Sequence, residues 1–350
     1  MTMSRMCRRM IGGAAASLIL SSVVVASRTA PLLLPPKLDE YLSNVVKLSA
    51  TERKRLTEGA AVTKLLESDP SKEVGVFGAI WIDVPIARYI EGLNDIEHFE
   101  TGRGYTVTRR ISVRPAIEDF GAMHLPEHDV RALRKCRLGD CDIKLDQAAI
   151  QRFQREVNWR APDPRPAADR VMQRVALDYV NRYLESGNER LPVYEDKPHP
   201  VALADEFRSM IGGMWEFTTM LPDMRSYLLD YPRVTLPQSS SFLYWQETVF
   251  GLKPTLRISH VTIHERPDQT VVTSKMLYAS HYIWATIELR MLHPDPSRGR
   301  GFWLVTVGRS RMDGLTGFAG PFIRRRVRSQ IQSATSAGLQ QTKQRLEQRR

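Results

Sequence analysis

FLYWQETVF, at residues 242–250, opens the stretch Phe242–Leu346 that decides the fold of this chain. Three more runs of similar composition follow at Leu256–His264, Val271–Leu292 and Phe302–Arg309. Val, Ile, Thr and aromatic residues dominate all four runs, which suits the pleated, half-buried surface of a β-sheet. Segments rich in turn-forming residues separate the runs, so the stretch predicts a sheet.

The segment Leu277–Met291 alternates apolar and polar positions. Its odd positions hold Leu277, Ala279, His281, Ile283, Ala285, Ile287, Leu289 and Met291. Its even positions include Ser280, Thr286, Glu288 and Arg290. A period of two predicts a strand with one apolar face, and a helix is the alternative for a segment of this length.

After Gly314 the pattern changes to that of a basic amphipathic helix of roughly six turns or more. One face of this helix collects Val327, Ile331, Ala334, Gly338 and Leu346. The small residues Ala334, Ala337 and Gly338 would let the helix approach a sheet closely. They would also leave room for a ligand between the helix and the sheet.

Three segments together carry a resemblance: Phe250–Pro254, Lys275–Tyr282 and Arg309–Leu315, which runs into the basic helix. They look like the START-like (helix-grip, polyketide cyclase/lipid transport) superfamily, in particular its exported bacterial members with an extended middle. The resemblance covers the last third of the chain and Glu73–Phe99. It implies an α+β fold in which a curved antiparallel sheet grips the C-terminal helix around a hydrophobic cavity. The superfamily includes enzymes, but no catalytic motif carries over onto this chain.

The composition is that of a globular protein, with 42% hydrophobic and 25% charged residues in a chain of 350. We divide the chain into a signal peptide at 1–26, a linker and N-terminal helix at 27–70, and a START-like domain at 71–350. A large helical insertion is expected within that domain, at residues 115–235.

The start of the chain has the pattern of a signal peptide. Arg5, Arg8 and Arg9 precede the apolar run Ile11–Val25, and a small-residue cleavage site ends at Ala26. This predicts a periplasmic or secreted protein that is cleaved near Ala26. An uncleaved membrane anchor is the alternative.

Cys136 and Cys141 are the two cysteines that follow the predicted signal peptide. Gly139 can supply the tight turn that a loop of this length needs. In an oxidising compartment we expect these cysteines to form a disulfide. A metal pair is the alternative, but this spacing without a second cysteine pair is a poor zinc signature.

The rest of the chain reads as one helix at Lys37–Ser68, strands at Glu73–Ile82 and Gly104–Arg114, and a helix capped by Asp83 that ends at Phe99. Inside the insertion we predict helices at Pro126–Lys135, Asp146–Val157, Ala167–Ser186, Val201–Met210 and Pro222–Asp230. Strand then helix at the start, and sheet then helix at the end, is the order that a helix-grip fold needs.

The predicted function is an exported protein that binds a lipid or another hydrophobic ligand and could transfer it. The walls of its cavity are expected to be Leu277, Ala279, His281, Ile283, Ala285, Trp303 and Val305. His281 could hydrogen-bond a ligand, because such cavities need a few polar groups. Arg309 could hold a phosphate or carboxylate. The alternative for His281 is a core histidine whose hydrogen bonds are satisfied within the protein. The alternative for Arg309 is an ion pair with Glu288 or Asp313.

Two other classes of function remain open. A hydrolase or cyclase on the same scaffold could use His281 with Glu288 or Glu247 as acid and base. A regular strand places Glu288 on the face opposite His281, which weakens the enzyme hypothesis. A structural protein of the cell envelope is the third alternative, and no cofactor is expected.

A metal site is not expected. His260 and His264 lie four apart in a predicted strand and could bind an ion with His281 or Glu265. Four strand residues span about 13 Å, which is too far for two ligands of one ion unless the strand bends. A polar sheet face is the simpler interpretation.

The basic excess of the chain is concentrated at its end. Ile323–Arg350 holds eight Arg and Lys residues and one Glu. An anionic membrane surface is the partner that such a helix suggests, and a solvated outer face is the alternative. We expect no nucleic acid, because the chain lacks a pattern of stacking aromatic residues.

Overall fold

The computed structural model describes residues 34–350 apart from residues 103, 251–252, 317–319 and 349–350. The predicted signal peptide at 1–26 lies outside the described residues. None of the helices in the described part has the length and apolar character needed to cross a bilayer. Leu33–Arg350 forms one compact unit, so the residues between the third and sixth strands do not separate from the sheet.

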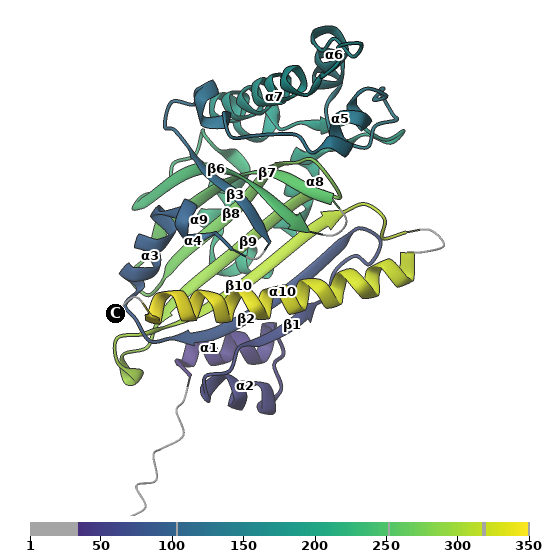
Figure 1. Cartoon of the computed structure of the whole chain (residues 1–350). Helices are drawn as coiled ribbons and strands as arrows, with labels where there is room; N and C mark the ends of the chain where they lie inside the picture. Colours follow the sequence, from purple (N-terminus) through teal and green to yellow (C-terminus); the bar gives the residue numbers. More distant parts are fainter. Residues whose placement is uncertain (1–33, 103, 251–252, 317–319, 349–350) are drawn as a thin grey trace, which may run out of the picture. The chain divides into compact units, whose positions relative to one another are not determined.

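Eight strands of the described chain pair into one antiparallel sheet (Figure 1). They are β1 (Val62–Leu66), β2 (Glu73–Ile82), β3 (Tyr105–Ile111), β6 (Ser239–Phe250), β7 (Lys253–Glu265), β8 (Thr270–Ala279), β9 (Ile283–Pro294) and β10 (Phe302–Met312). Their order across the sheet is β1-β2-β10-β9-β8-β7-β6-β3. The first strands of the chain therefore lie at one edge, beside the last strand, because β2 pairs with β10 along its whole length.

The run Val271–Leu292 is two strands and not one. A turn at residues 280–282 separates β8 from β9, and Tyr282 in that turn has a φ of 58°. Backbone bonds hold the turn, since the Ser280 N–H donates to the Leu256 carbonyl at 2.9 Å. The turn has three residues, so odd positions stay apolar on both sides of it. Alternation alone could not reveal the break.

The N-terminal region contains α1 (Pro36–Glu40), the π-helical turn η1 (Tyr41–Val45) and α2 (Ala50–Thr57). A single helix over Lys37–Ser68 is therefore wrong. Lys47 has a positive φ of 58° and interrupts the helical path. Ser49 then starts α2 through a capping box with Glu52, and residues 62–66 form the edge strand β1.

The segment between β2 and β3 forms α3 (Ile86–Asn94) and α4 (Ile96–Phe99). The predicted strand is present, but the single helix predicted to end at Phe99 is divided into two at Asp95, and Asp83 does not occupy the cap position. Pro85 does, because its extended backbone turns the chain into α3. The backbone N–H of Asp83 instead donates to Glu347 near the end of the chain, at 2.8 Å.

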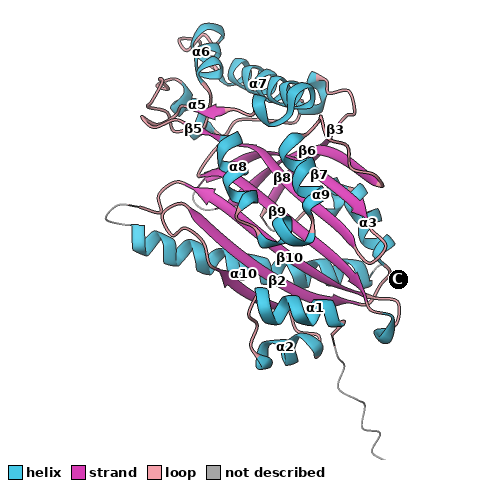
Figure 2. Ribbon diagram, turned by 180° about the vertical axis from the view of Figure 1, so that it is seen from behind, coloured by secondary structure: helices cyan, strands magenta, loops and turns pink. Residues whose placement is uncertain are grey.

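The insertion between β3 and β6 is mainly helical (Figure 2). It contains α5 (Glu127–Leu133), α6 (Gln147–Glu156), α7 (Arg165–Ser186), α8 (Leu203–Gly212) and α9 (Pro222–Asp230). It also contains the short elements η2 (Ile117–Phe120), η3 (Gly187–Arg190), β4 (Val193–Tyr194), β5 (Val201–Ala202) and η4 (Glu216–Met220). Each predicted helix is present with its ends displaced by a few residues, and Cys136 and Cys141 form the predicted disulfide.

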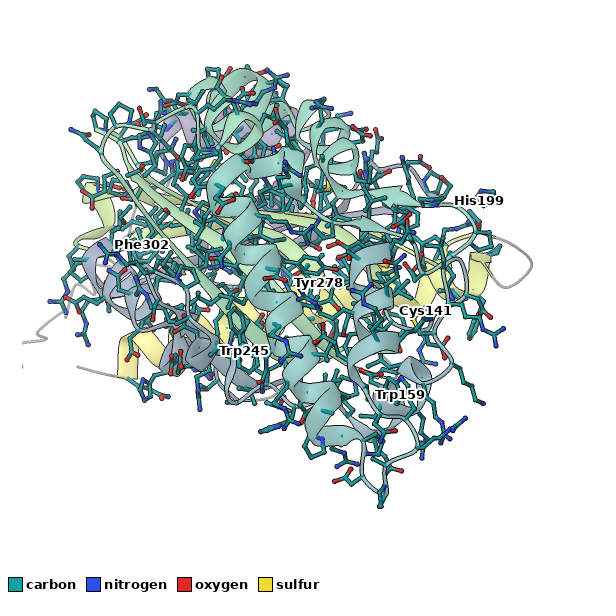
Figure 3. All side chains as sticks on the ribbon, turned by 90° about the horizontal axis from the view of Figure 1, so that it is seen from above. Cys141, Trp159, His199, Trp245, Tyr278 and Phe302 are labelled. Carbon is teal, nitrogen blue, oxygen red and sulfur yellow. A yellow bond between two sulfur atoms is a disulfide. The ribbon has the colours of Figure 1, made fainter. Side chains whose placement is uncertain are left out.

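Different helices cover the two faces of the sheet (Figures 1 and 2). The C-terminal helix α10 (Gly320–Gln348), α3 and α4 cover the face that we call the helix face. Helices α1, α8 and α9 cover the opposite one, the insertion face. The main core lies on the insertion face and includes Phe77, Leu289, Val307, Val175, Phe207 and Met224. Tyr278 of β8 belongs to it, with its ring 5.3 Å from that of Tyr179 in α7 (Figure 3).

Helix α10 confirms the predicted amphipathic helix. Near its start, Val327 and Ile331 pack against a small cluster at the ends of β2 and β10. Near its end, Leu339 and Leu346 are buried. The helix comes close to β2 at Gly78, where an added Cβ would lie only 2.8 Å from the Leu339 side chain. A glycine is needed there because the helix and strand leave no room for a side chain.

Candidate ligand-binding site

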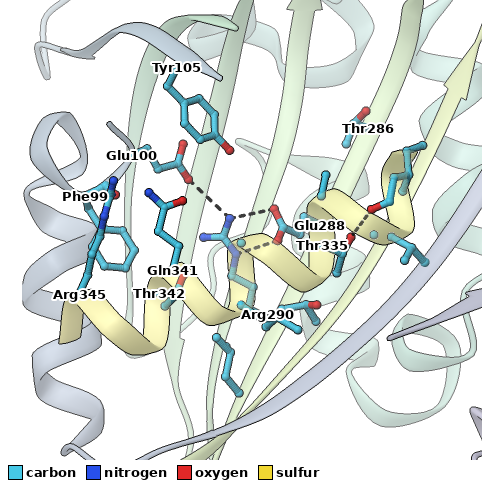
Figure 4. Close-up of a pocket in the computed structure, with 18 of the residues that line it drawn as sticks. Phe99, Glu100, Tyr105, Thr286, Glu288, Arg290, Thr335, Gln341, Thr342 and Arg345 are labelled. Carbon is cyan, nitrogen blue, oxygen red and sulfur yellow. Dashed lines mark hydrogen bonds and ion pairs between the residues drawn. The ribbon is translucent and has the colours of Figure 1, made fainter. Parts of the chain in front are cut away.

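A pocket of about 310 Å³ lies between α10 and the helix face of the sheet (Figure 4). Its apolar lining includes Val76, Tyr89, Phe99, Leu304, Ile331 and Leu339. Its hydroxyl groups come from Thr286, Thr306, Thr335 and Thr342, and its charges from Glu100, Arg257, Glu288, Arg290 and Arg345. The pocket is therefore amphipathic, whereas the predicted cavity was apolar.

An ion-pair network occupies the sheet side of the pocket. Arg290 binds Glu288 in a bidentate manner, with N–O distances of 3.0 and 2.8 Å, and lies 3.6 Å from Glu100. Burial raises the pKa of Glu288, but the charge and hydrogen bonds of Arg290 outweigh it, so the pKa lies below its ordinary value. Burial lowers the pKa of Arg290, and Glu288 outweighs that effect in turn. Both groups are charged.

Glu100 sits among polar groups at the β3–β6 edge. Its Oε2 accepts hydrogen bonds from Tyr244 Oη at 3.2 Å and from Gln246 Nε2 at 3.0 Å. The charge of Glu100, followed by burial, raises the pKa of Tyr105 to about 12. Tyr105 points its hydroxyl into the pocket and remains a hydrogen-bond donor at neutral pH (Figure 4).

Arg257 of β7 differs from the other arginines of the pocket. Arg345 donates to the backbone carbonyls of Phe99 and Thr101, and Arg290 is paired as described above. Arg257 is part-buried, and its Nε is buried without a hydrogen-bond partner among the described residues. The described chain also gives its guanidinium group no ion pair. A guanidinium group in this position is a ready site for an anion.

The predicted cavity walls lie on the wrong face of the sheet. Leu277, Ala285, Trp303 and Val305 belong to the core of the insertion face, while Ala279 and Ile283 pack with Met276. None of them lines the pocket under α10. The even positions Thr286, Glu288 and Arg290 line it instead. In β9 the period of two separated the faces correctly, but the more apolar face is covered by the insertion and not by α10.

His281 and Arg309 also lie away from the pocket. Arg309 pairs with Glu73 at 2.6 Å, and not with Glu288 or Asp313. His281 contacts Asp129 and the Asp142 carbonyl of the insertion. Glu288 is on the other face, and Glu247 accepts a hydrogen bond from Thr106. The acid–base pairs considered for an enzyme are therefore not formed.

His260 and His264 form no metal site with His281 or Glu265 among the described residues. His260 Nδ1 lies 2.9 Å from the Tyr183 hydroxyl, and burial lowers its pKa to about 3. His264 Nε2 lies 3.4 Å from an Asp223 oxygen. Both histidines serve the packing of the insertion face.

Glu100 and Arg257 were not predicted from the sequence. Glu100 lies at the C-terminal end of α4, where nothing in the local pattern marks it. Arg257 lies in β7, where most residues are buried. Its charge within this strand was the one feature of the sequence that could have marked it as a site residue.

Compared with known protein families, curated proteins and solved structures, the chain matches none. The function is therefore inferred from the pocket itself.

Proposed function

We propose that this chain is a helix-grip protein that binds a small amphipathic anion in the pocket under α10. The order of elements supports the fold assignment: β2, α3, α4 and β3 come first, and β6 to β10 run into α10. The guanidinium group of Arg257 carries the functional proposal, because it lies in that pocket, makes no ion pair among the described residues and has a buried Nε without a hydrogen-bond partner there.

The chemistry of the lining defines the ligand. A buried N–H without an acceptor is costly, and an anion bound beside Arg257 would satisfy its Nε. The apolar side chains and the threonine hydroxyls suit a short hydrocarbon portion with a few polar atoms. A volume of about 310 Å³ is at the lower end for ligand pockets, so a lipid with two acyl chains would not be enclosed. A single-chain carboxylate fits these conditions.

Helix α10 provides a route into the pocket. Ala334 and Gly338 line the pocket and are nevertheless exposed, so solvent reaches it past these small residues. A Cβ added at Gly338 would meet no atom within 4 Å. Small side chains at these positions keep the entrance wide enough for a ligand, whereas the sequence pattern suggested that they face the sheet.

The test is calorimetric titration of the full chain with decanoate and with decanol, which share the alkyl chain and differ in charge. We expect decanoate to bind one site and Arg257→Ala to weaken it by about 10-fold or more, since a charged hydrogen bond contributes about 1.5–3 kcal/mol. Decanol should bind weakly and equally to both proteins, because it gains nothing from the guanidinium group.

The control variant is Arg300→Ala, which removes an exposed arginine outside the pocket and should leave decanoate affinity unchanged. Equal decanoate affinity in wild type and Arg257→Ala, or no binding at all, would overturn the proposal. Native mass spectrometry of the full chain purified from its own source would then show whether any other molecule occupies the pocket.

The beginning of α10 supports a second proposal, contact with an anionic membrane surface. Phe322 is 70% exposed, and Arg325 and Arg326 are exposed one turn further along the helix. An exposed aromatic ring beside two cations is the arrangement that peripheral helices present to lipid headgroups. Such a contact would place the pocket near a source of amphipathic anions.

We expect the full chain to sediment with vesicles that contain phosphatidylglycerol and not with phosphatidylcholine vesicles. The double variant R325A/R326A should bind about 30-fold more weakly, from about 1 kcal/mol per basic residue near the surface. The double variant R155A/R170A removes the same charge from exposed positions of the insertion and is the control. If both double variants lose the same affinity, only net charge matters and the start of α10 is not the contact.

A further inference from the structure

Two histidines and an aspartate meet where α5 lies against the turn between β8 and β9. His128 and Asp129 belong to α5, and His281 belongs to the turn. Asp129 Oδ1 is 3.0 Å from His128 Nε2 and 3.0 Å from His281 Nε2. One ligand atom from each residue lies within 4.8 Å of the other two. This cluster is separate from the pocket under α10.

Both ring nitrogens of His281 face hydrogen-bond acceptors. Its Nδ1 lies 3.1 Å from the Asp142 carbonyl, and its Nε2 faces the Asp129 carboxylate. A neutral imidazole has one N–H and can donate to only one of these acceptors. If Nδ1 donates to the carbonyl, the Nε2 lone pair faces a carboxylate. A metal cation between Nε2 and the carboxylate, or a second proton on the imidazole, would remove this repulsion.

His128 also places a ring nitrogen against the Asp129 carboxylate. Its Nε2 is buried, lies close to the same carboxylate oxygen and makes no hydrogen bond among the described residues. A second proton on His281 would leave His128 Nε2 unsatisfied. A metal ion would use both imidazole nitrogens and the carboxylate at once.

We propose that His128, Asp129 and His281 bind a divalent transition-metal ion, with Zn²⁺ as the best match. Zinc–nitrogen bonds of about 2.0–2.1 Å place neighbouring tetrahedral ligands about 3.3 Å apart, close to the 3.0 Å separation of each histidine nitrogen from Asp129 Oδ1. The Asp142 carbonyl holds the Nδ1–H of His281, as outer groups do for metal-bound histidines. Three protein ligands leave a position for water or an exogenous ligand beside His128, whose side chain is 32% exposed.

The ion would join the insertion to the sheet. Asp129 and His281 are 152 residues apart in the chain and are both buried. Metal binding would therefore stabilise the docking of α5 onto the β8–β9 turn, because the site exists only when these two parts are packed together.

The experiment uses the full chain after removal of metals with EDTA. We expect calorimetry to show one equivalent of Zn²⁺ bound, and Co²⁺ to give the visible absorption of a low-symmetry site with nitrogen ligands. His128→Ala should lower zinc affinity by more than about 100-fold, beyond the loss typical of an outer-shell residue. Zinc should raise the thermal unfolding midpoint of the wild type and leave that of His128→Ala unchanged.

His128→Ala is the primary variant because its partial exposure allows the chain to fold without it, whereas Asp129→Asn and His281→Gln alter buried groups. The control is His124→Ala, which removes a histidine of the same insertion that is 71% exposed and pairs with Asp169. Absence of zinc binding in the wild type would overturn the proposal and leave a protonated His281 as the partner of Asp129. Equal zinc affinity in the wild type and His128→Ala would overturn it as well.

Discussion

Gly187→Ala is expected to lower the free energy of unfolding by about 3 kcal/mol or more, and to abolish folding if the wild type is marginally stable. Gly187 ends α7 with a φ of +64°, a conformation in which a side chain is strained. A Cβ at this position would lie 1.5 Å from the Tyr231 carbonyl oxygen. The backbone of the Tyr231–Pro232 loop would have to move away, and the packing between α7 and α9 would open.

Urea denaturation followed by far-UV circular dichroism measures this effect. The matched control is Gly212→Ala, at the end of α8, where an added Cβ meets no atom within 4 Å. That substitution should be neutral or stabilise the chain by up to about 1 kcal/mol. If the free energy of unfolding of Gly187→Ala lies within about 1 kcal/mol of the wild-type value, the prediction is wrong and the Tyr231–Pro232 loop can move at little cost.

Raising the pH from about 7 to about 9.5 is expected to stabilise the chain by about 3 kcal/mol through Lys275. This side chain is fully buried in β8, where it donates to Asn188 and to the Leu228 carbonyl. Burial lowers the pKa of Lys275 from 10.5 to about 7. Above pH 7 the folded chain releases this proton while the unfolded chain keeps it. The unfolded state then binds more protons than the folded state, so the free energy of unfolding rises with pH. The added stability is lost again as the pH falls back to 7.

Lys275→Met should remove this pH dependence, because methionine has similar length and no titratable group. Lys37→Met, at a side chain that is 89% exposed, should keep it. The free energy of unfolding is measured at several pH values below 10, because burial raises the pKa of Tyr183 and Tyr278 and tyrosine ionisation contributes above that range. A wild-type slope that persists in Lys275→Met would assign the effect to another group.

Local patterns predicted most of the elements. Strand β2 has the predicted bounds, and the helices of the insertion and α10 appear where apolar residues recur at helical spacing. Two of the predictions that failed did so where a short local feature interrupts a longer pattern. Lys47 interrupts the N-terminal helix, and the turn at residues 280–282 divides one long alternating run into β8 and β9.

The candidate site was much harder to predict. Glu100 follows α4, while Arg257 and Arg290 come from β7 and β9, so the three meet only in the folded sheet. His281 was singled out as a ligand contact on the sheet, yet its partner Asp129 lies in the insertion. The local sequence around one residue does not show which residue far along the chain it will contact.

The sequence by itself indicated most of the strands and helices, showed that the strands have two different faces, and led us to expect the Cys136–Cys141 disulfide. Only the tertiary structure decided which face α10 covers. Strands β2 and β8 are buried on both faces, so hydrophobicity alone cannot tell one covering layer from the other. The insertion took the more apolar face because its larger surface buries more apolar area. Helix α10 was left with the polar face that forms the pocket.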